Sequence, residues 1–460
     1  MTLPASRTTR RGFLLAGAGA LAGAALGARP VGALAAIGAA PGPELPATGA
    51  RPDPAQPSIA IVGAGLAGLR CAHMLWTRTG ARPLASTVYE ANPERAGGRC
   101  WTLRGFFDAG LITEHGGQLI DSTHYAVRAL ARRLGLREEV VGGGDLPSGE
   151  EAFWIDGAHY SQREADADWE AVGFRAFHQA LLETRTPAGL ARLDSLSVPE
   201  WLEGTAIGAS SRLGKLLLAN AVTENGGDPS DMSALGALIE ITDKSGQQEL
   251  ALLPGDNEKF HVAGGNDQLV AGMLAELPPE AVQHDRRLVA LRASSDGTST
   301  LSFDTPAGTL DVRADVVVLA LPFSTLRQAD LSKSGLSAAK LEVVEQLGMG
   351  TNAKLHVELS HKTWPALGFA GAAYGEWDRF CCGWDDSVPL GPEASPALFV
   401  GFPGAEVGAA GLTGAAHGEA PAADVDWLLG EIEPVYPGTS AAYTGRAYED
   451  HWALDPYVMG

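Results

Sequence analysis

The first candidate binding motif along the chain is a glycine-rich turn, Gly63-Ala64-Gly65-Leu66-Ala67-Gly68. A short β-branched run precedes this turn and a helical pattern follows, which predicts a strand, a tight turn and a helix N-terminus. Backbone N–H groups and the helix dipole at such a turn can bind a pyrophosphate. Gly63 would allow the turn, Gly65 would let the phosphate approach, and Gly68 would let helix and strand pack closely. Because the chain has 58 glycines, this motif alone is weak evidence.

Further residues along the chain could complete a dinucleotide site. Glu90, followed by Ala91, ends the next strand-like run, about 20 residues after the turn, where an acid can accept hydrogen bonds from ribose hydroxyls. Gly97-Gly98-Arg99 brings backbone close to a ligand, and the planar fork of Arg99 suits a pyrophosphate. Gly116-Gly117-Gln118-Leu119 offers a second close backbone approach.

Taken in this order, the motifs resemble those of the flavin-containing amine oxidase family, which includes monoamine, polyamine and L-amino acid oxidases. Similar family motifs recur later, in Val262-Ala263-Gly264-Gly265, Arg286-Arg287-Leu288, Val316-Val317-Val318-Leu319 and Gly350-Thr351-Asn352-Ala353-Lys354. The resemblance covers residues 58–460 and implies FAD as the cofactor. The cofactor-binding residues that it implies are Gly63, Gly65, Leu66, Ala67, Gly68, Glu90, Ala91, Arg99, Gly117, Gln118, Leu119 and Leu288.

Lys354 is the one catalytic residue that the resemblance implies, since it matches the family lysine that holds a water beside flavin N5. The family reaction is hydride transfer from the amine α carbon to N5. Imine hydrolysis follows, and reoxidation by O2 gives hydrogen peroxide. An exposed lysine on a strand is the alternative interpretation from spacing alone. The aromatic residues Tyr374, Trp377 and Trp384 are too scattered to assign, and core or loop positions are expected for them.

The predicted substrate is a small amine rather than an amino acid. Many L-amino acid oxidases have an arginine that pairs with the substrate carboxylate where this chain has Leu119. Burying an unpaired carboxylate is costly, so an amino acid would need another arginine, such as Arg104 or Arg128, to reach the site. An L-amino acid oxidase, a flavin desaturase or protoporphyrinogen-type oxidase, and a non-catalytic remnant stay open as alternatives.

The strands and helices expected around these residues make up an α/β fold. The resemblance implies a doubly wound, Rossmann-like FAD-binding domain, from residues 58–125 and 255–345, interleaved with a mixed-sheet α+β substrate domain, from residues 126–254 and 346–460. Amphipathic or apolar patterns predict helices over residues 67–78, 126–136, 213–221 and 232–239. The family continues beyond the segment that ends at Gly460, so a final FAD-binding segment is expected to be missing from this chain.

Composition narrows the function further. The 460 residues carry a formal charge of -21 with a pI near 4.9, so a nucleic acid is not an expected partner. The four cysteines show no pairing or metal spacing and are expected to be thiols, and the histidines show no metal spacing. No metal site is therefore predicted. The sequence gives no indication of an oligomeric state.

The first residues are predicted to be a targeting signal rather than part of the fold. Arg10-Arg11, a mild apolar run and Ala33-Leu34-Ala35 resemble a twin-arginine signal peptide over residues 1–35 with its cleavage site. A proline-rich linker follows over residues 36–57. Export by the twin-arginine pathway, to the periplasm, cell surface or medium, is expected, without a stable membrane span after cleavage.

Overall fold

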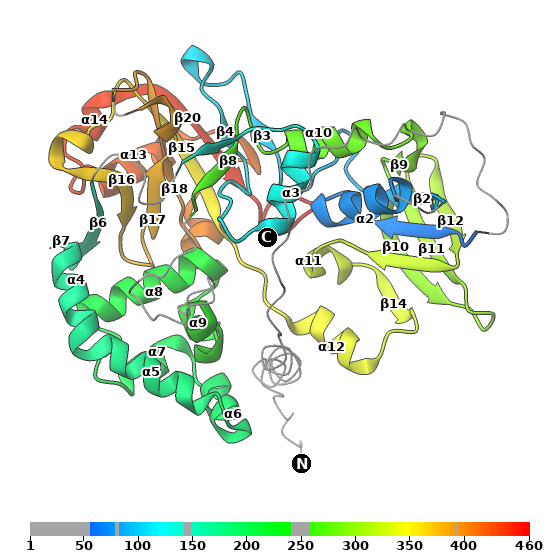
Figure 1. The fold of residues 1–460 in the computed structure, drawn as a ribbon, viewed down its shortest axis with the longest axis horizontal. Coiled ribbons are helices and arrows are strands. Elements are labelled where there is room, and N and C mark those ends of the chain that lie inside the picture. Colours follow the sequence, from blue (N-terminus) through cyan, green and yellow to red (C-terminus); the bar gives the residue numbers. More distant parts are fainter. Residues whose placement is uncertain (1–55, 79–81, 142–148, 241–251, 253–257, 392) are drawn as a thin grey trace, which may run out of the picture.

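The structure is a computed structural model that describes residues 56–78, 82–141, 149–240, 252, 258–391 and 393–460. The predicted signal peptide and nearly all of the predicted linker lie outside these residues. Figure 1 shows three parts: a small parallel sheet with α2, a large mixed sheet at the opposite side, and a group of helices beside the large sheet. No helix in the described residues is long and apolar enough to cross a membrane.

A four-stranded parallel sheet carries the glycine-rich turn. Its order is β13-β1-β2-β9, and every neighbouring pair is parallel. The strands are β1 (Ile59–Val62), β2 (Ser86–Tyr89), β9 (Val282–Gln283) and β13 (Val316–Leu319). Helices α2 (Leu66–Trp76), α3 (Tyr125–Arg133) and α10 (Gln268–Ala275) share a core with its Ile61 and Val88. This is the dinucleotide-binding half of the predicted α/β fold.

A second sheet covers the other face of the parallel sheet. Because side chains alternate along a strand, Ala60 and Val62 point away from Ile61 and pack with Leu301 and Phe303 of this second sheet. The second sheet has the order β12-β11-β10-β14. Its strands are β10 (Arg287–Ala293), β11 (Ser299–Thr305), β12 (Gly308–Ala314) and β14 (Asp330–Lys333).

An eight-stranded mixed sheet forms the largest layer, in the order β19-β20-β15-β18-β17-β16-β6-β7. Its strands are β6 (Glu150–Ile155), β7 (Ala158–Tyr160), β15 (Ala353–Leu359), β16 (Phe369–Tyr374), β17 (Cys382–Asp385), β18 (Ala397–Gly401), β19 (His417–Glu419) and β20 (Tyr443–His451). Helix α13 (Ala422–Ile432) packs on it through Leu428, against Leu355 and Val357 of β15, and α14 (Thr439–Ala442) lies beside it. Every residue of β15 is buried, so both of its faces are covered.

Six helices of the described residues follow one another along the chain, and all but the first share a separate apolar core around Trp201 and Leu217. They are α4 (Gln162–Asp168), α5 (Phe174–Glu183), α6 (Pro187–Ser195), α7 (Val198–Glu203), α8 (Arg212–Asn225) and α9 (Ala234–Glu240). The sequence patterns placed α8 and α9 within a few residues of these bounds. Ser161 and Ser197 begin α4 and α7 with complete capping boxes, which satisfy the first N–H groups of both helices.

Shorter elements connect these layers. They are β3 (Thr102–Leu103), β4 (Thr113–Glu114), β5 (Glu138–Val140), β8 (Phe260–Val262), α11 (Phe323–Leu326) and α12 (Ala338–Gln346). Single turns of 3-10 or π helix lie at Asp108–Gly110, Trp169–Gly173, Pro229–Asp231, Pro279–Ala281, Pro365–Leu367, Val388–Leu390 and Val407–Gly411. The predicted domain boundary after residue 125 separates α3 from the parallel sheet, yet Leu130 and Ala131 of α3 pack into that sheet's core.

Candidate functional site

The three glycines of the first motif meet different surroundings. Gly63 has a φ of +97°, and a Cβ on it would lie 2.7 Å from the Ala320 backbone oxygen. A Cβ on Gly68 would lie 1.9 Å from the Gly63 oxygen, so this residue lets α2 pack onto the turn. A Cβ on Gly65 would meet nothing within 4 Å and would project into open space. Gly65 is therefore the position where a ligand can approach the backbone.

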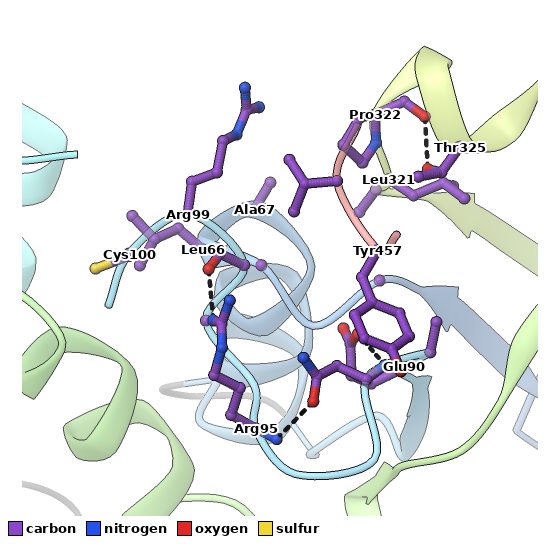
Figure 2. A pocket seen from close by; sticks show the side chains of 18 of the residues that line it. Leu66, Ala67, Glu90, Arg95, Arg99, Cys100, Leu321, Pro322, Thr325 and Tyr457 are labelled. Carbon is purple, nitrogen blue, oxygen red and sulfur yellow. Dashed lines mark hydrogen bonds between the residues drawn. The ribbon is translucent and has the colours of Figure 1, made fainter. Parts of the chain in front are cut away.

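A cavity of about 800 Å³ opens at the N-terminus of α2. Figure 2 shows Leu66 and Ala67 in it, with Arg99 and Arg95 on one side and Glu90 and Tyr457 on the other. The predicted cofactor residues that line it are Gly63, Gly65, Leu66, Ala67, Glu90, Ala91, Arg99, Gly117, Leu119 and Leu288. Gly68 and Gln118 are not among the lining residues: the first packs against the turn and the second turns towards Lys354.

The polar groups of this cavity fit a dinucleotide. Gly65 begins α2 without a side-chain cap, which leaves N–H groups of its first turn for a phosphate. Among the described residues Arg99 pairs with no Asp or Glu side chain, and its guanidinium donates to the Gly460 main-chain oxygen at 3.2 Å. Glu90 accepts from the backbone N–H groups of Ala64 and Asn92 at 2.7 and 2.8 Å, and a carboxylate has further lone pairs for ribose hydroxyls.

Several lining residues were missed by the sequence reasoning, among them Arg286, Arg95 and Tyr457. Arg286 has a buried Nε atom without a hydrogen-bond partner among the described residues, as a site built for an absent ligand would leave it. Arg95 lies 4.3 Å from the ring centre of Trp101 and 3.9 Å from Asp455. Tyr457 enters the cavity from the end of the chain. Arg286 stands beside the predicted Leu288, so its motif gave the available signal.

Lys354 is buried on β15, with 3% of its surface exposed, which removes the alternative of an exposed strand lysine. Its Nζ donates to the backbone oxygens of Glu114 and Gly116, at 3.0 and 2.8 Å, and to Gln118 Oε1 at 2.8 Å. These three acceptors use all three ammonium protons. Burial lowers the pKa of Lys354. The lysine thereby holds the glycine turn whose Gly117 lines the cavity.

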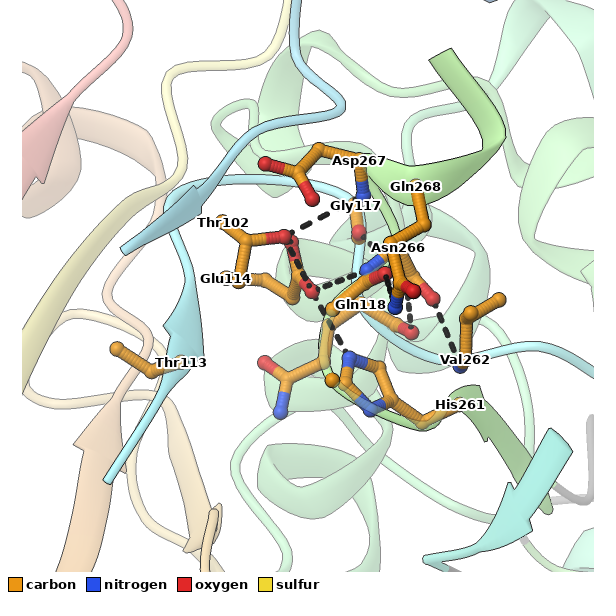
Figure 3. A network of polar contacts seen from close by, with 12 residues as sticks. Thr102, Thr113, Glu114, Gly117, Gln118, His261, Val262, Asn266, Asp267 and Gln268 are labelled. Atoms are coloured by element: carbon orange, nitrogen blue, oxygen red, sulfur yellow. Dashed lines mark hydrogen bonds and ion pairs between the residues drawn. The ribbon is translucent and has the colours of Figure 1, made fainter. Parts of the chain in front are cut away.

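A second hydrogen-bond network, around Glu114 and Asn266, holds the same glycine turn (Figure 3). The buried Glu114 carboxylate accepts from Thr102 Oγ1, from the Asn266 N–H at 2.7 Å, and hydrogen-bonds His261 Nε2 at 2.9 Å. Asn266 Nδ2 then donates to the backbone oxygens of Gly117 and Gln118. Burial alone would lower the pKa of His261, but the contacts with Glu114 raise this pKa above its usual value. The turn is therefore held by hydrogen bonds from both sides.

Histidines far apart in the sequence meet around Asp450 of β20. His115 Nδ1 and His417 Nδ1 lie 2.7 and 2.6 Å from Asp450 Oδ1, and His356 Nε2 lies 3.2 Å from Oδ2. The three ligand atoms of His115, His417 and Asp450 lie within 4.8 Å of one another, a grouping that sequence spacing did not reveal. The short contacts are hydrogen bonds, because atoms that share a metal ion lie farther apart. His417 Nε2 also reaches Asp455 Oδ2 at 3.1 Å.

The remaining candidate residues differ in whether they lie near Lys354 or are engaged elsewhere. Arg104 pairs with Asp267, and Arg128 pairs with Glu138, so both arginines are already engaged with carboxylates. Tyr374 packs against a buried cluster that contains Phe153, and Trp377 packs against the core of the helical part, as expected for core aromatics. Trp384 differs, because Lys354 Nζ lies 5.4 Å from its ring centre. The four cysteines are free thiols, as expected.

Two curated relatives are named as an amino acid oxidase and a flavin-containing amine oxidase. The chain is 26% identical over 365 residues to an L-glutamate oxidase precursor of Streptomyces viridosporus, with 67% of this chain and 54% of the relative covered. It is 26% identical over 357 residues to a Mycobacterium tuberculosis protein assigned as a flavin-containing monoamine oxidase, with 75% of this chain and 73% of the relative covered. The chain thus spans about half the length of the first relative.

Solved structures share the fold. Cyclohexylamine oxidase from Brevibacterium oxydans superposes with a TM-score of 0.70 at 20% identity, covering 88% of this chain and 86% of that one. Putrescine oxidase bound to putrescine gives a TM-score of 0.68 at 22% identity, covering 88% and 87%. The model of the flavin-containing amine oxidoreductase family matches residues 66–460. The glycine turn, its cavity and this match show that the chain belongs to the flavin-containing amine oxidoreductase family, whose cofactor is FAD.

Proposed function

We propose that this chain is an FAD-dependent oxidase of amines that lack an α-carboxylate. The observation that carries the proposal is Lys354, buried on β15 and bonded to the glycine turn that lines the dinucleotide cavity. A buried lysine is costly unless its charge is used, and this one lies beside the residues assigned to the flavin. When bound, FAD would supply the acceptor for a hydride from the carbon next to the amine nitrogen, and O2 and water would complete the turnover to peroxide, a carbonyl product and ammonia or a free amine.

The chain's own residues divide the work of holding the cofactor. The α2 N-terminus and Arg99 would hold the pyrophosphate, and Glu90 would accept from the ribose. The turn at Gly116–Gly117 is fixed by Lys354 on one side and by Asn266 on the other. A turn that is fixed in this way would hold a bound cofactor in a constant position, which favours a productive approach of the substrate.

The preference for an amine over an amino acid rests on three side chains. Leu119 lines the cavity, and by the sequence resemblance it stands at the position where many L-amino acid oxidases have a carboxylate-binding arginine. Arg104 donates to both oxygens of Asp267, and Arg128 donates to Glu138, so neither is available for a substrate carboxylate. An amino acid would then bring an unpaired carboxylate into the site, which is unfavourable.

The test is anaerobic reduction of the FAD-loaded chain by three probes: cyclohexylamine, putrescine and L-glutamate. We expect either amine to bleach the flavin absorbance and to yield peroxide when air is admitted, and L-glutamate to do neither. Bleaching by L-glutamate at the same concentration would overturn the substrate class. Bleaching by none of a wider amine panel would overturn the oxidase, and a flavin desaturase would then be examined.

A further inference from the structure

The loop after β17 carries a carboxylate, Asp386, that is not among the residues lining the dinucleotide cavity and is not an acceptor of Lys354. Trp384 lies in β17, and the Asp386 N–H still bonds to Leu398 of β18 at 3.0 Å, so the chain is extended through Asp386. Residues two apart on an extended chain point to the same side. Asp385 points to the other side, where it makes a buried ion pair with Lys362 at 2.8 Å. Two neighbouring acids therefore have different surroundings.

Asp386 reaches Lys354 through the amide of Gln118. Gln118 Oε1 accepts from Lys354 Nζ at 2.8 Å, and Gln118 Nε2 donates to Asp386 Oδ1. This orientation of the amide is required, because an ammonium offers only donors and a carboxylate offers only acceptors. The amide separates the two charges, and the three protons of Lys354 are already used. Lys354 therefore does not pair directly with Asp386.

Two buried polar atoms on this side of β17 have no hydrogen-bond partner among the described residues. They are Asp386 Oδ2 and Trp384 Nε1. Leaving such atoms unpaired is unfavourable, so native proteins retain them where a ligand or water completes the bonding. An unpartnered carboxylate oxygen suits a cation, because it accepts the cation's protons. The ring of Trp384 already lies near one cation, since Lys354 Nζ is 5.4 Å from its centre.

We propose that Asp386, flanked by Trp384, is the subsite that takes the ammonium group of the incoming amine. The proposal rests on the proposed function and names the residue that selects a cationic substrate. The indole N–H then bonds to a water or to a second polar atom of the substrate. A carboxylate at this place also repels the α-carboxylate of an amino acid, so the same residue attracts one class of substrate and rejects the other.

The charge that this subsite requires is present near neutral pH. Burial raises the pKa of Asp386 to about 6, with Glu114 adding to the rise, while Lys354, the Thr113 hydroxyl and His261 act against it. Asp386 is therefore ionised at pH 7 and becomes neutral as the pH falls through about 6. Ammonium binding should weaken over that same interval.

The experiment uses tert-butylamine, a cation at neutral pH that has no hydrogen on the carbon next to nitrogen and so is not oxidised by hydride transfer. Its binding to the FAD-loaded chain is measured by calorimetry, with tert-butanol as the neutral probe of similar shape and pivalate as the anionic one. Asp386→Asn keeps an oxygen that accepts from Gln118 and removes the charge. Asp378→Asn removes a charge from an exposed position in the turn before β17 and is the matched control.

We expect Asp386→Asn to weaken tert-butylamine binding by about tenfold or more, with tert-butanol unchanged and pivalate bound no more weakly, because a charged hydrogen bond is lost. Asp378→Asn should change tert-butylamine binding less than twofold, as expected for an exposed charge. Equal tert-butylamine affinity in the wild type and Asp386→Asn would overturn the subsite. So would a parallel loss for tert-butanol, since that pattern means that Asp386 only positions Gln118.

The outcomes for the two proposals are distinguishable. A wild type that oxidises cyclohexylamine, with Asp386→Asn leaving the apparent Kd of flavin reduction unchanged, would retain the oxidase and reject the subsite. A wild type that binds tert-butylamine through Asp386 but oxidises no amine would retain the subsite and reject the oxidase. An unchanged flavin spectrum in Asp386→Asn verifies that the cofactor is still held.

Discussion

At the scale of single residues, Lys354 gives the clearest kinetic prediction. Lys354→Met keeps the length of the side chain and removes its charge. The reduced flavin should then react with O2 about 100-fold more slowly, because no cation stabilises the negative charge that develops during this step. Stopped-flow mixing of the reduced protein with O2 measures this step. FAD content and thermal midpoint are the controls, because the backbone oxygens of Glu114 and Gly116 also lose a donor. An unchanged oxidation rate would exclude Lys354 from this role.

Gly65 and Gly68 form a matched pair, because the same added methyl group meets different surroundings. A Cβ on Gly65 points into open space, so Gly65→Ala should fold normally and bind FAD about tenfold more weakly. A Cβ on Gly68 meets the Gly63 oxygen at 1.9 Å, so Gly68→Ala should destabilise the protein by about 2 kcal/mol. Urea unfolding without FAD and a fluorescence titration with FAD separate the two effects. Gly68→Ala with wild-type unfolding would contradict the packing argument.

At the scale of elements, Asp450 joins β20 to β15, to β19 and to the turn after β4. It receives His356 from β15, His417 from β19 and His115 from the turn. Burial lowers the pKa of His356 to about 4, so this histidine is neutral at pH 7. Although burial alone would lower it, hydrogen bonds to Asp450 and Asp455 raise the pKa of His417. The raised pKa favours the protonated form of His417, which lies between the carboxylates of Asp450 and Asp455.

This assignment predicts how stability depends on pH. A raised pKa means that the stabilisation by His417 is complete below the unfolded value of about 6.5 and is lost as the pH rises through the folded value. His417→Gln should lower the free energy of unfolding by about 3 kcal/mol at pH 6, because Asp450 and Asp455 lose a buried charged partner. The difference from wild type should shrink at alkaline pH. Urea unfolding across this range measures it, and a difference independent of pH would contradict a protonated His417.

The elements also show what the sequence could and could not predict. The positions of Gly63 and Glu90 follow from local spacing, since a turn and a strand end are each set by near neighbours. Local spacing placed Lys354 on a strand but left its burial open, and its assignment rested on the family resemblance. The role of Asp386 depends on the register between β17 and β18 and on the side chain of Gln118, which no local pattern encodes. The cluster at Asp450 likewise unites residues from four separate segments. The histidine spacing in the sequence therefore could not predict that these side chains lie close together.

At the scale of the whole molecule, we propose that the chain is exported by the twin-arginine route, on the evidence of Arg10-Arg11 and the apolar run that follows. This pathway carries folded proteins, which suits a chain that must enclose FAD before transport. Replacing both arginines with lysine should keep the protein in the cytoplasm of a bacterial host while FAD content is unchanged. Fractionation and immunoblotting measure this. Export of the twin-lysine variant at the wild-type level would reject the route.

The overall charge gives a prediction that no single residue carries. A net charge of -21 produces a negative potential around the protein, which concentrates cations near its surface, and salt screens that attraction. If the substrate is a cationic amine, kcat/KM should fall about threefold as ionic strength rises from about 0.01 to 0.1 M, over which the Debye length shortens from about 30 to 10 Å. The dication putrescine should show a steeper fall than the monocation cyclohexylamine, because the attraction scales with ligand charge. The rate of the reduced flavin with neutral O2 should not change, and this is the internal control. Equal salt dependence for the two amines would show that the surface charge does not guide the substrate, and selection would then rest on contacts inside the site, of which Asp386 is the first to test.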